Sequence, residues 1–292
     1  MKRQRRIDCI YIDEDGRKKY ERVYFVESTF NSDDQTSYHL NGFIANGGNG
    51  TVFICYDTKT NEKFAVKFLR MLDVTRRERF AFESLVLGDL EHENILSLVD
   101  TGYVETTHRS SIPFLVTEYF STTVAKKVES GGKLTIAETK NFGTQICNAF
   151  KHLHVMGIVH RDVKPSNFLI EGDRVVVSDF GLAKTHTEEG ANRFWRGDMT
   201  ATDERVGSIP WMSPELFKYA QDKAARIDDR SDLYQIGRVL WYMHTGDVVG
   251  IPDRDDDQSG GKLFNIVMKA TQSKPEKRFQ NADEMLAALN EL

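Results

Sequence analysis

The residues best suited to chemistry lie in the polar segment 160–167, between an apolar helical pattern and a buried-strand pattern. The segment holds a carboxylate in Asp162, a cation in Lys164 and an amide in Asn167. Phosphoryl transfer needs this mixture, because a carboxylate orients the attacking hydroxyl, a cation lies near the moving phosphate, and oxygen atoms bind Mg²⁺. A charged loop after a helix can also be a plain solvated connection, so support must come from elsewhere in the chain.

A second carboxylate provides that support. Asp179 begins Asp-Phe-Gly two residues after the end of an apolar run at 175–177 that is expected to be a strand. Together, the two segments resemble the signature motifs of protein kinases. The resemblance covers roughly residues 38–290 and is nearest to bacterial members of the eukaryotic-like serine/threonine protein kinases.

The resemblance implies an α+β fold in two lobes, the bilobal protein kinase fold. A small antiparallel β lobe with one helix is expected at 38–117, a hinge at 118–120, and a larger, mainly helical lobe at 121–292. Residues 1–37 are expected to form an N-terminal extension. Within it, alternating strand-like residues on either side of an Asp-Gly turn predict a β-hairpin at 7–26, followed by a polar linker at 28–37.

In the family, each of these polar residues has a role that can be placed on this chain. Asp162 would orient the acceptor hydroxyl, Lys164 would steady the γ-phosphate, and Asn167 and Asp179 would hold Mg²⁺. Asp232, at the start of an apolar helical pattern, matches the family aspartate that anchors the backbone of the catalytic loop. His160 is expected to be a packed core histidine.

A lysine and a glutamate complete the catalytic set. Lys67 lies in Phe-Ala-Val-Lys on a predicted strand at 63–69, and the resemblance implies that it contacts the α- and β-phosphates. Glu83 lies in a predicted helix at 76–91 and would hold Lys67 through an ion pair, which would make the position of the helix a switch.

The nucleotide is expected to lie against a glycine-rich segment at 44–52. Glycines let backbone amides close over phosphates without a side-chain clash. Ala45 stands at the family's first glycine position, while the second and third positions keep glycine. The expected ATP-binding residues are Ile44, Gly47, Gly50, Val52, Ala65, Lys67, Thr117, Glu118, Phe120 and Leu169.

A long segment from 179 to 215 suits regulation. Thr200 and Thr202 resemble the paired threonines of bacterial relatives, and Arg161 could receive a phosphate placed on one of them. At the end of this segment Glu215 is expected to pair with Arg278.

The acidic run at 253–257 lacks the glycine and glutamate of an EF-hand, which favours a solvated loop. The usual lower-lobe helix is also missing there.

Composition sets the broad class. The chain has 292 residues, 40% of them hydrophobic, and a net charge of −5, so a packed protein without a nucleic-acid-coating surface is expected. Cys9, Cys55 and Cys147 lack metal-ligand spacing and indicate reduced thiols. With no long apolar run and no signal-peptide core, we expect a cytoplasmic protein that binds no membrane and lacks a transmembrane or sensor domain.

The sequence therefore predicts an ATP- and Mg-dependent protein kinase that acts on serine and threonine hydroxyls and phosphorylates its own activation segment. Its partners would be a protein substrate and either a regulatory protein or a second copy. A pseudokinase scaffold, a small-molecule kinase, and a tyrosine or dual-specificity kinase remain as alternatives. The intact Lys67, Asp162 and Asp179 argue against the first, and the complete segment 207–215 argues against the second.

Overall fold

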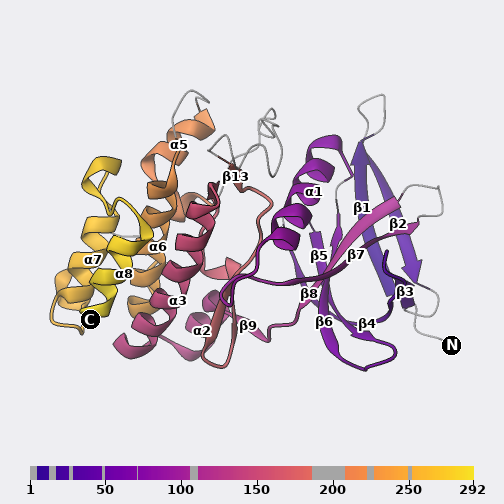
Figure 1. Ribbon diagram of the computed structural model, residues 1–292, viewed down its shortest axis with the longest axis horizontal. Helices are drawn as coiled ribbons and strands as arrows, with labels where there is room; N and C mark the ends of the chain where they lie inside the picture. Colours follow the sequence, from indigo (N-terminus) through magenta and orange to yellow (C-terminus); the bar gives the residue numbers. More distant parts are fainter. Residues whose placement is uncertain are drawn as a thin grey trace. The chain divides into compact units, whose positions relative to one another are not determined.

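The computed structural model describes residues 29–47, 50–70, 72–104, 111–185, 208–219, 227–248 and 252–292. For 5–12, 18–25, 105 and 220–221 it describes the backbone alone. The chain divides into two compact units (Figure 1). The N-terminal unit comprises Met1–Leu90 and Leu96–Tyr119, and the C-terminal unit comprises Glu91–Ile95 and Phe120–Leu292. No helix within the described ranges has the length and apolarity that a membrane crossing requires.

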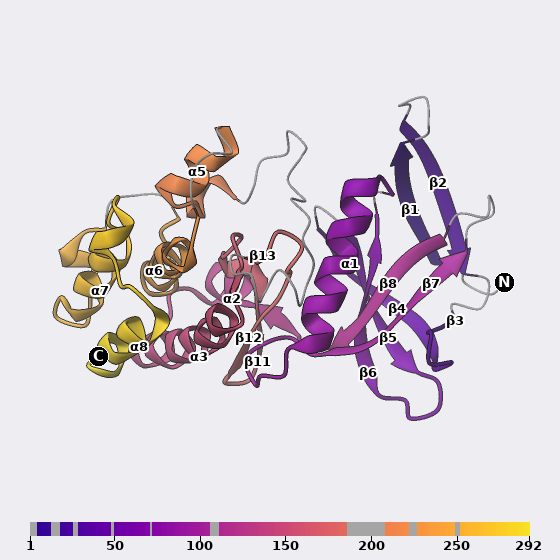
Figure 2. The same ribbon diagram turned by 45° about the horizontal axis from the view of Figure 1, so that its top comes forward.

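The N-terminal unit is built on a six-stranded antiparallel sheet with the strand order β3-β4-β5-β6-β8-β7. One helix, α1 (Val74–Asp89), lies along this sheet (Figures 1 and 2). A separate pair, β1 (Arg5–Ile12) and β2 (Lys18–Phe25), forms the predicted hairpin. The strands of the sheet are β3 (Thr29–Asn31), β4 (Ser37–Asn46), β5 (Gly50–Asp57), β6 (Lys63–Leu69), β7 (Leu98–Glu105) and β8 (Ser111–Glu118).

Residues 29–36 are not the linker that the polar sequence predicts. Thr29–Asn31 pairs with β4, and the side chain of Phe30 is buried. A single aromatic residue in a polar stretch gives no periodicity, so the prediction missed a strand held by tertiary packing. These residues are therefore part of the N-terminal unit.

The C-terminal unit is mainly helical. Its helices α3, α6, α7 and α8 pack together, and α5 lies beyond α6 (Figure 2). Small sheets join β9 (Thr122–Thr123), β11 (Phe168–Glu171) and β12 (Arg174–Val177), and β10 (Ile158–Val159) with β13 (Lys184–Thr185). The helices are α2 (Val124–Gly131), α3 (Ile136–Val155), α5 (Pro214–Gln221), α6 (Asp229–Thr245), α7 (Lys262–Ala270) and α8 (Ala282–Asn290). Short 3₁₀ turns cover Pro165–Asn167, Ile209–Trp211, Arg254–Asp256 and Pro275–Lys277.

Helix α3 has clear start and stop signals in its sequence. The hydroxyl of Thr135 accepts a hydrogen bond from the backbone N–H of Glu138 at 3.2 Å, and the Glu138 carboxylate accepts one from the backbone N–H of Thr135 at 2.9 Å. This reciprocal capping box satisfies two amides that the helix itself cannot pair. Gly157, with φ of 72°, follows the helix end in the left-handed conformation that glycine adopts easily. The apolar stripe and Gly157 predict a helix from about residue 135 to 156, and the observed helix Ile136–Val155 confirms it.

The segment Glu91–Ile95 follows α1 in the chain but bonds within the C-terminal unit. Asn94 donates from Nδ2 to Gln145 Oε1 at 2.9 Å and to the carbonyl of Val175 at 3.0 Å. Its own carbonyl accepts from the backbone N–H of Val177 at 2.9 Å, and Ile95 forms a parallel bridge to the same residue. The chain therefore leaves the N-terminal unit after α1 and returns to it at β7.

The acidic run near residue 255 is only partly the solvated loop expected from its composition. Asp257 is buried, and its carboxylate accepts from Ser259 N at 2.7 Å, Ser259 Oγ at 2.8 Å and Phe264 N at 2.9 Å. These bonds fix the entry into α7. In the described residues between α6 and α7, the only helical element is the 3₁₀ turn Arg254–Asp256, which agrees with the expected loss of a lower-lobe helix.

Candidate active site

The catalytic loop at 160–167 is held by a buried aspartate on α6. Asp232 accepts hydrogen bonds from the backbone N–H groups of His160 and Arg161, both at 2.9 Å, and lies 3.1 Å from His154 Nε2 on α3. The His160 side chain is fully buried, as predicted, and its Nε2 lies 3.1 Å from the carbonyl of Ser178. One carboxylate thus joins the loop backbone to two helices.

Asp162, Lys164 and Asn167 come together as expected. Lys164 Nζ donates to Asp162 Oδ2 at 2.6 Å, and Asn167 Nδ2 donates to the same oxygen at 3.2 Å and to the Asp162 carbonyl at 2.8 Å. The other oxygen, Oδ1, is buried and has no hydrogen-bond partner among the described residues. Burial raises the pKa of Asp162, and the nearby charge of Lys164 offsets part of that effect. The loop therefore presents a buried carboxylate with one oxygen oriented and one available.

Asp179 is tied to the same loop through its neighbours. Ser178 donates from its backbone N and from its hydroxyl to the carbonyl of Asn167, both at 2.9 Å. Phe180 is fully buried, with its ring 5.1 Å from that of His160. Asp179 has φ of 64°. Residues other than glycine adopt this left-handed conformation uncommonly, at a cost of about 1–3 kcal/mol, and such residues cluster at active sites.

These residues fit a magnesium ion. The two hydrogen bonds described for the Asn167 side chain both use its nitrogen, which leaves the amide oxygen as a ligand, and Asp179 supplies a carboxylate. Within the described residues there is no cluster of three His, Cys, Asp or Glu side chains that could enclose a metal. Mg²⁺ commonly binds through one or two carboxylates together with substrate phosphates and water, so an incomplete set of protein ligands suits a nucleotide-bound ion.

The N-terminal unit contains the expected ion pair. Lys67 Nζ on β6 donates to both carboxylate oxygens of Glu83 on α1, at 2.7 and 2.8 Å. The Glu83 side chain is 3% exposed and that of Lys67 is 18% exposed. Asp73 fixes the start of α1, because its carboxylate accepts from Arg76 N at 3.1 Å. The lysine is thus held by a helix whose own start is capped.

One face of the N-terminal sheet is left partly accessible along the predicted nucleotide positions. On β6, Val66 and Phe68 are buried while Ala65 and Lys67 are half-buried. Gly50 lies against Lys67, and a Cβ at this glycine would lie 3.0 Å from Lys67 Cγ. Ile44, Val52, Thr117 and Glu118 belong to this same unit, whereas Phe120 and Leu169 lie in the C-terminal unit. Thr117 pairs with Ala65 across β8 and β6 and is itself buried.

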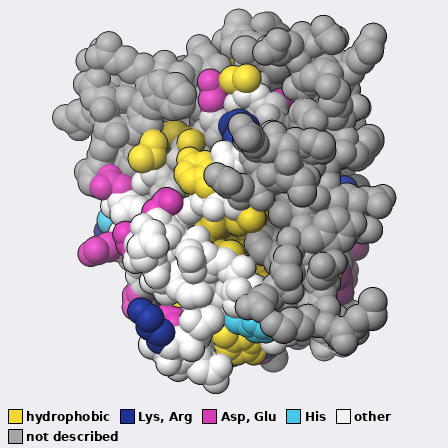
Figure 3. All heavy atoms as spheres, turned by 90° about the vertical axis from the view of Figure 1, so that its right-hand side faces the viewer, with side chains coloured by type: hydrophobic (Ala, Val, Ile, Leu, Met, Phe, Trp, Pro, Cys, Tyr) yellow, Lys and Arg dark blue, Asp and Glu magenta, His cyan; other side chains and the backbone are white. Residues whose placement is uncertain are grey.

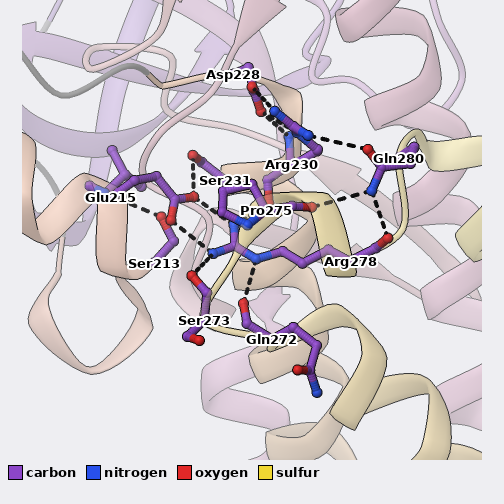
Figure 4. A network of polar contacts seen from close by, with 11 residues as sticks. Ser213, Glu215, Asp228, Arg230, Ser231, Gln272, Ser273, Pro275, Arg278 and Gln280 are labelled. Carbon is purple, nitrogen blue, oxygen red and sulfur yellow. Dashed lines mark hydrogen bonds and ion pairs between the residues drawn. The ribbon is translucent and has the colours of Figure 1, made fainter.

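The predicted pair of Glu215 and Arg278 anchors a larger network (Figure 4). Arg278 donates to the two Glu215 oxygens at 2.6 and 2.8 Å, and Ser231 Oγ donates to Glu215 Oε1 at 2.7 Å. Arg230 joins the network by donating to Asp228 and, from Nη1, to Gln280 Oε1 at 3.2 Å. Arg230 was not predicted, because a charged residue at a helix start resembles any solvated residue.

Ser208 is a second residue that the sequence alone did not reveal. Lys164 Nζ donates to Ser208 Oγ at 3.3 Å as well as to Asp162. A serine in a loop gives no signal of this contact, which only the tertiary fold creates.

Of the three predicted regulatory residues, Thr200 and Thr202 lie outside the described residues. Arg161 is buried, and its Nε donates to the carbonyl of Leu182 at 2.7 Å.

The fold and these contacts define the protein kinase domain, and the model of that family matches residues 38–291. The chain belongs to the protein kinase family. It is 32% identical over 273 residues to a probable serine/threonine-protein kinase of Streptomyces coelicolor, a match that covers 85% of this chain and 38% of the relative. It is 31% identical over 276 residues to the serine/threonine-protein kinase PknB of Mycobacterium tuberculosis, covering 86% of this chain and 42% of the relative. The chain thus spans about two fifths of the length of these relatives.

Proposed function

We propose that this chain is an ATP- and Mg²⁺-dependent protein kinase that transfers the γ-phosphate to serine or threonine hydroxyls of a protein substrate. The observation that carries the proposal is the buried Asp162, with Oδ2 oriented by Lys164 and Oδ1 available, on a loop fixed by Asp232. ATP bound with Mg²⁺ supplies the phosphoryl group. The chain supplies positioning and charge, which make up most of catalysis in this chemistry.

Each catalytic residue has a task that its contacts support. Oδ1 of Asp162 accepts a hydrogen bond from the substrate hydroxyl and so aims its oxygen at phosphorus. Lys164, held by Asp162 and Ser208, keeps a positive charge beside the transferred group. Asn167 and Asp179 provide oxygens for Mg²⁺. Lys67 orients the α- and β-phosphates, and its bidentate contact with Glu83 limits how far the ammonium can move.

Specificity for serine and threonine is supported by the lysine in the catalytic loop and by the names of the relatives. Tyrosine-specific members of the family usually carry arginine and alanine in this segment, whereas Lys164 is present here. Tyrosine or dual specificity is the alternative, and a panel of peptides that differ only in the acceptor residue separates the two.

Regulation is proposed to act through the segment before Glu215. Thr200 and Thr202 are the proposed sites of self-phosphorylation, with Arg161 as the residue that receives the phosphate. A regulatory protein or a second copy of the chain would trigger the reaction. Alanine at both threonines should lower activity. Unchanged activity, together with unmodified peptides in mass mapping, would remove this part of the proposal.

The decisive experiment is intact-mass analysis after incubation with ATP and Mg²⁺. The parent should gain phosphate, and Asp162→Asn should gain none while still binding nucleotide in a thermal-shift assay. Asp283→Asn is the matched control, because the Asp283 side chain is 58% exposed and the residue lies far in sequence from the catalytic loop at 160–167. Comparable phosphate transfer by Asp162→Asn would remove Asp162 from the mechanism. A parent that binds nucleotide but transfers no phosphate, even to added peptides, would favour the pseudokinase scaffold.

A further inference from the structure

Residues 29–36, the strap, include the edge strand β3 of the N-terminal sheet and also bond to β7 at its other edge. Their first residues form β3, which pairs with β4 at one edge. Just beyond β3, the backbone N–H of Asp33 donates to the carbonyl of Thr101 on β7, at the opposite edge, with a distance of 2.8 Å. Thr101 Oγ1 also donates to the Asp33 carboxylate at 3.1 Å. The strap therefore forms one edge of the sheet and, two residues after β3, bonds to the strand at the other edge.

Phe30 fills an aromatic slot on the buried face of this sheet. Its ring centroid lies 4.9 Å from that of Phe114, 5.6 Å from Phe68 and 5.6 Å from Tyr38. Gly102 makes room for this arrangement, because a Cβ there would lie 2.5 Å from the Phe114 ring and 3.2 Å from the strap's backbone. Phe30 itself is only 7% exposed. Phe30 thus packs closely against three aromatic rings, and Gly102 lets the strap backbone approach β7.

The slot lies behind the strand that carries the nucleotide lysine. Successive residues of a strand point to opposite faces, so Phe68 meets Phe30 while Lys67, one residue before it, meets Glu83. Phe68 also pairs with Phe114 across β6 and β8. An aromatic side chain that packs against two neighbouring strands limits how they can shift or twist, and the Lys67 ammonium moves with its strand.

We propose that Phe30 is a positioning residue for nucleotide binding, through which the strap makes the N-terminal extension a working part of the kinase. The proposal rests on the proposed function in that Lys67 must contact the phosphates of ATP. Removing the Phe30 ring leaves a cavity behind β6, and the strand relaxes toward it. Lys67 then loses its fixed distance to Glu83, which weakens the hold on the phosphates without touching the groups of the catalytic loop.

The test compares Phe30→Ala with a conservative change and an exposed control. Phe30→Ala should raise both the Kd for a fluorescent ATP analogue and the KM for ATP about five-fold or more, equivalent to about 1 kcal/mol. The kcat and the KM for a peptide substrate should change less than two-fold. Phe30→Leu, which refills most of the slot, should restore nucleotide binding. Tyr103→Ala should behave as the parent, because Tyr103 is an aromatic residue of the same sheet that is 60% exposed.

The ring of Tyr103 is largely exposed, so its loss should change little in the packing of this unit. Figure 3 shows further hydrophobic side chains between the grey atoms on one face of the molecule. All measurements are made at a temperature at which circular dichroism shows each variant to be folded. A folded Phe30→Ala with unchanged Kd and KM for nucleotide overturns the proposal.

A second pair of variants keeps the proposal testable when alanine prevents folding. Phe30→Val and Phe30→Thr, which have smaller side chains than leucine and suit a strand, must then differ from the parent in nucleotide Kd, and values equal to the parent's in both would also overturn it. A different result would refute the proposed function. A parent that binds nucleotide but transfers no phosphate refutes phosphotransfer, while the Kd comparison still decides the role of Phe30. A parent that binds no nucleotide in the presence of Mg²⁺ refutes both.

Discussion

Replacing Arg278 with methionine tests how the C-terminal unit holds Glu215 at the start of α5. The Arg278 side chain is fully buried and donates to the Glu215 carboxylate and to the carbonyls of Arg230, Gln272 and Ser273. Arg278→Met keeps most of the side-chain volume but removes every donor. Glu215, 13% exposed, would remain as a buried charge with Ser231 as its remaining side-chain donor among the described residues.

Breaking one partner of a buried ion pair destabilises a protein by about 3–5 kcal/mol. At about 2–4 °C per kcal/mol for a domain of this size, the melting temperature should fall by roughly 6–20 °C in differential scanning fluorimetry. Lys151→Met is the control, because the 2.7 Å pair of Lys151 with Asp283 is about half exposed and should be worth less than ~1 kcal/mol. The double variant Arg278→Met with Glu215→Met should recover stability relative to Arg278→Met.

The same variant has a predictable response to pH. Burial raises the pKa of Glu215, but hydrogen bonds from Arg278 and Ser231 and the Arg278 charge outweigh burial and lower the pKa overall. A carboxylate with a lowered pKa stabilises the fold above its unfolded pKa, and this contribution is lost as pH falls through the folded value. The difference in stability between parent and Arg278→Met should therefore shrink below about pH 4.3. A difference that is constant with pH, or a melting temperature equal to that of Lys151→Met, would refute the reasoning.

Three further changes have defined outcomes. Glu83→Gln should raise the KM for ATP about ten-fold in steady-state assays, because a charge-assisted bond to Lys67 contributes about 1.5–3 kcal/mol; an unchanged KM would contradict the role of the pair. Ser208→Ala should lower kcat about two- to five-fold with little change in the KM for ATP, since Lys164 loses one neutral acceptor. Asp257→Ala should lower the free energy of unfolding by about 1–2 kcal/mol in urea titrations at pH 7. Burial raises the pKa of Asp257, but hydrogen bonds from Phe264 and Ser259 lower that pKa overall. The difference in unfolding free energy between the parent and Asp257→Ala should therefore shrink below about pH 4. Equal stability of the two proteins at pH 7 would contradict this prediction.

Much of the fold was predictable because its signals are local. The capping box at Thr135, the glycine at 157 and the apolar stripe between them give α3 to within a residue or two. The candidate catalytic residues could be predicted because the polar side chains concerned lie in short motifs. Predicting the pair of Lys67 and Glu83 needed the family's pattern, because Glu78 lies in the same predicted helix and spacing alone does not choose between the two glutamates.

The features that were missed depend on contacts between distant parts of the chain. Phe30 is one aromatic residue in a polar stretch, and only the slot formed by β4, β6 and β8 makes it a core residue. Asp257 looks like its exposed acidic neighbours until the start of α7 supplies amide donors. Arg230 and Ser208 are common surface residue types. In each case the residue type does not predict the contact, because the contact depends on a partner that is distant in sequence or brought close only by the fold.

The segment Glu91–Ile95 has a consequence for dividing the protein. A single cut in the chain cannot separate the two units, because residues 91–95 belong to the C-terminal unit and lie between two parts of the N-terminal unit. A fragment comprising 120–292 would lack Asn94, leaving Gln145, the Val175 carbonyl and the Val177 amide without the partner that they have in the whole chain. A synthetic peptide carrying 91–97 is therefore the natural complement of that fragment. The two units are interleaved in sequence, and neither is an excisable module.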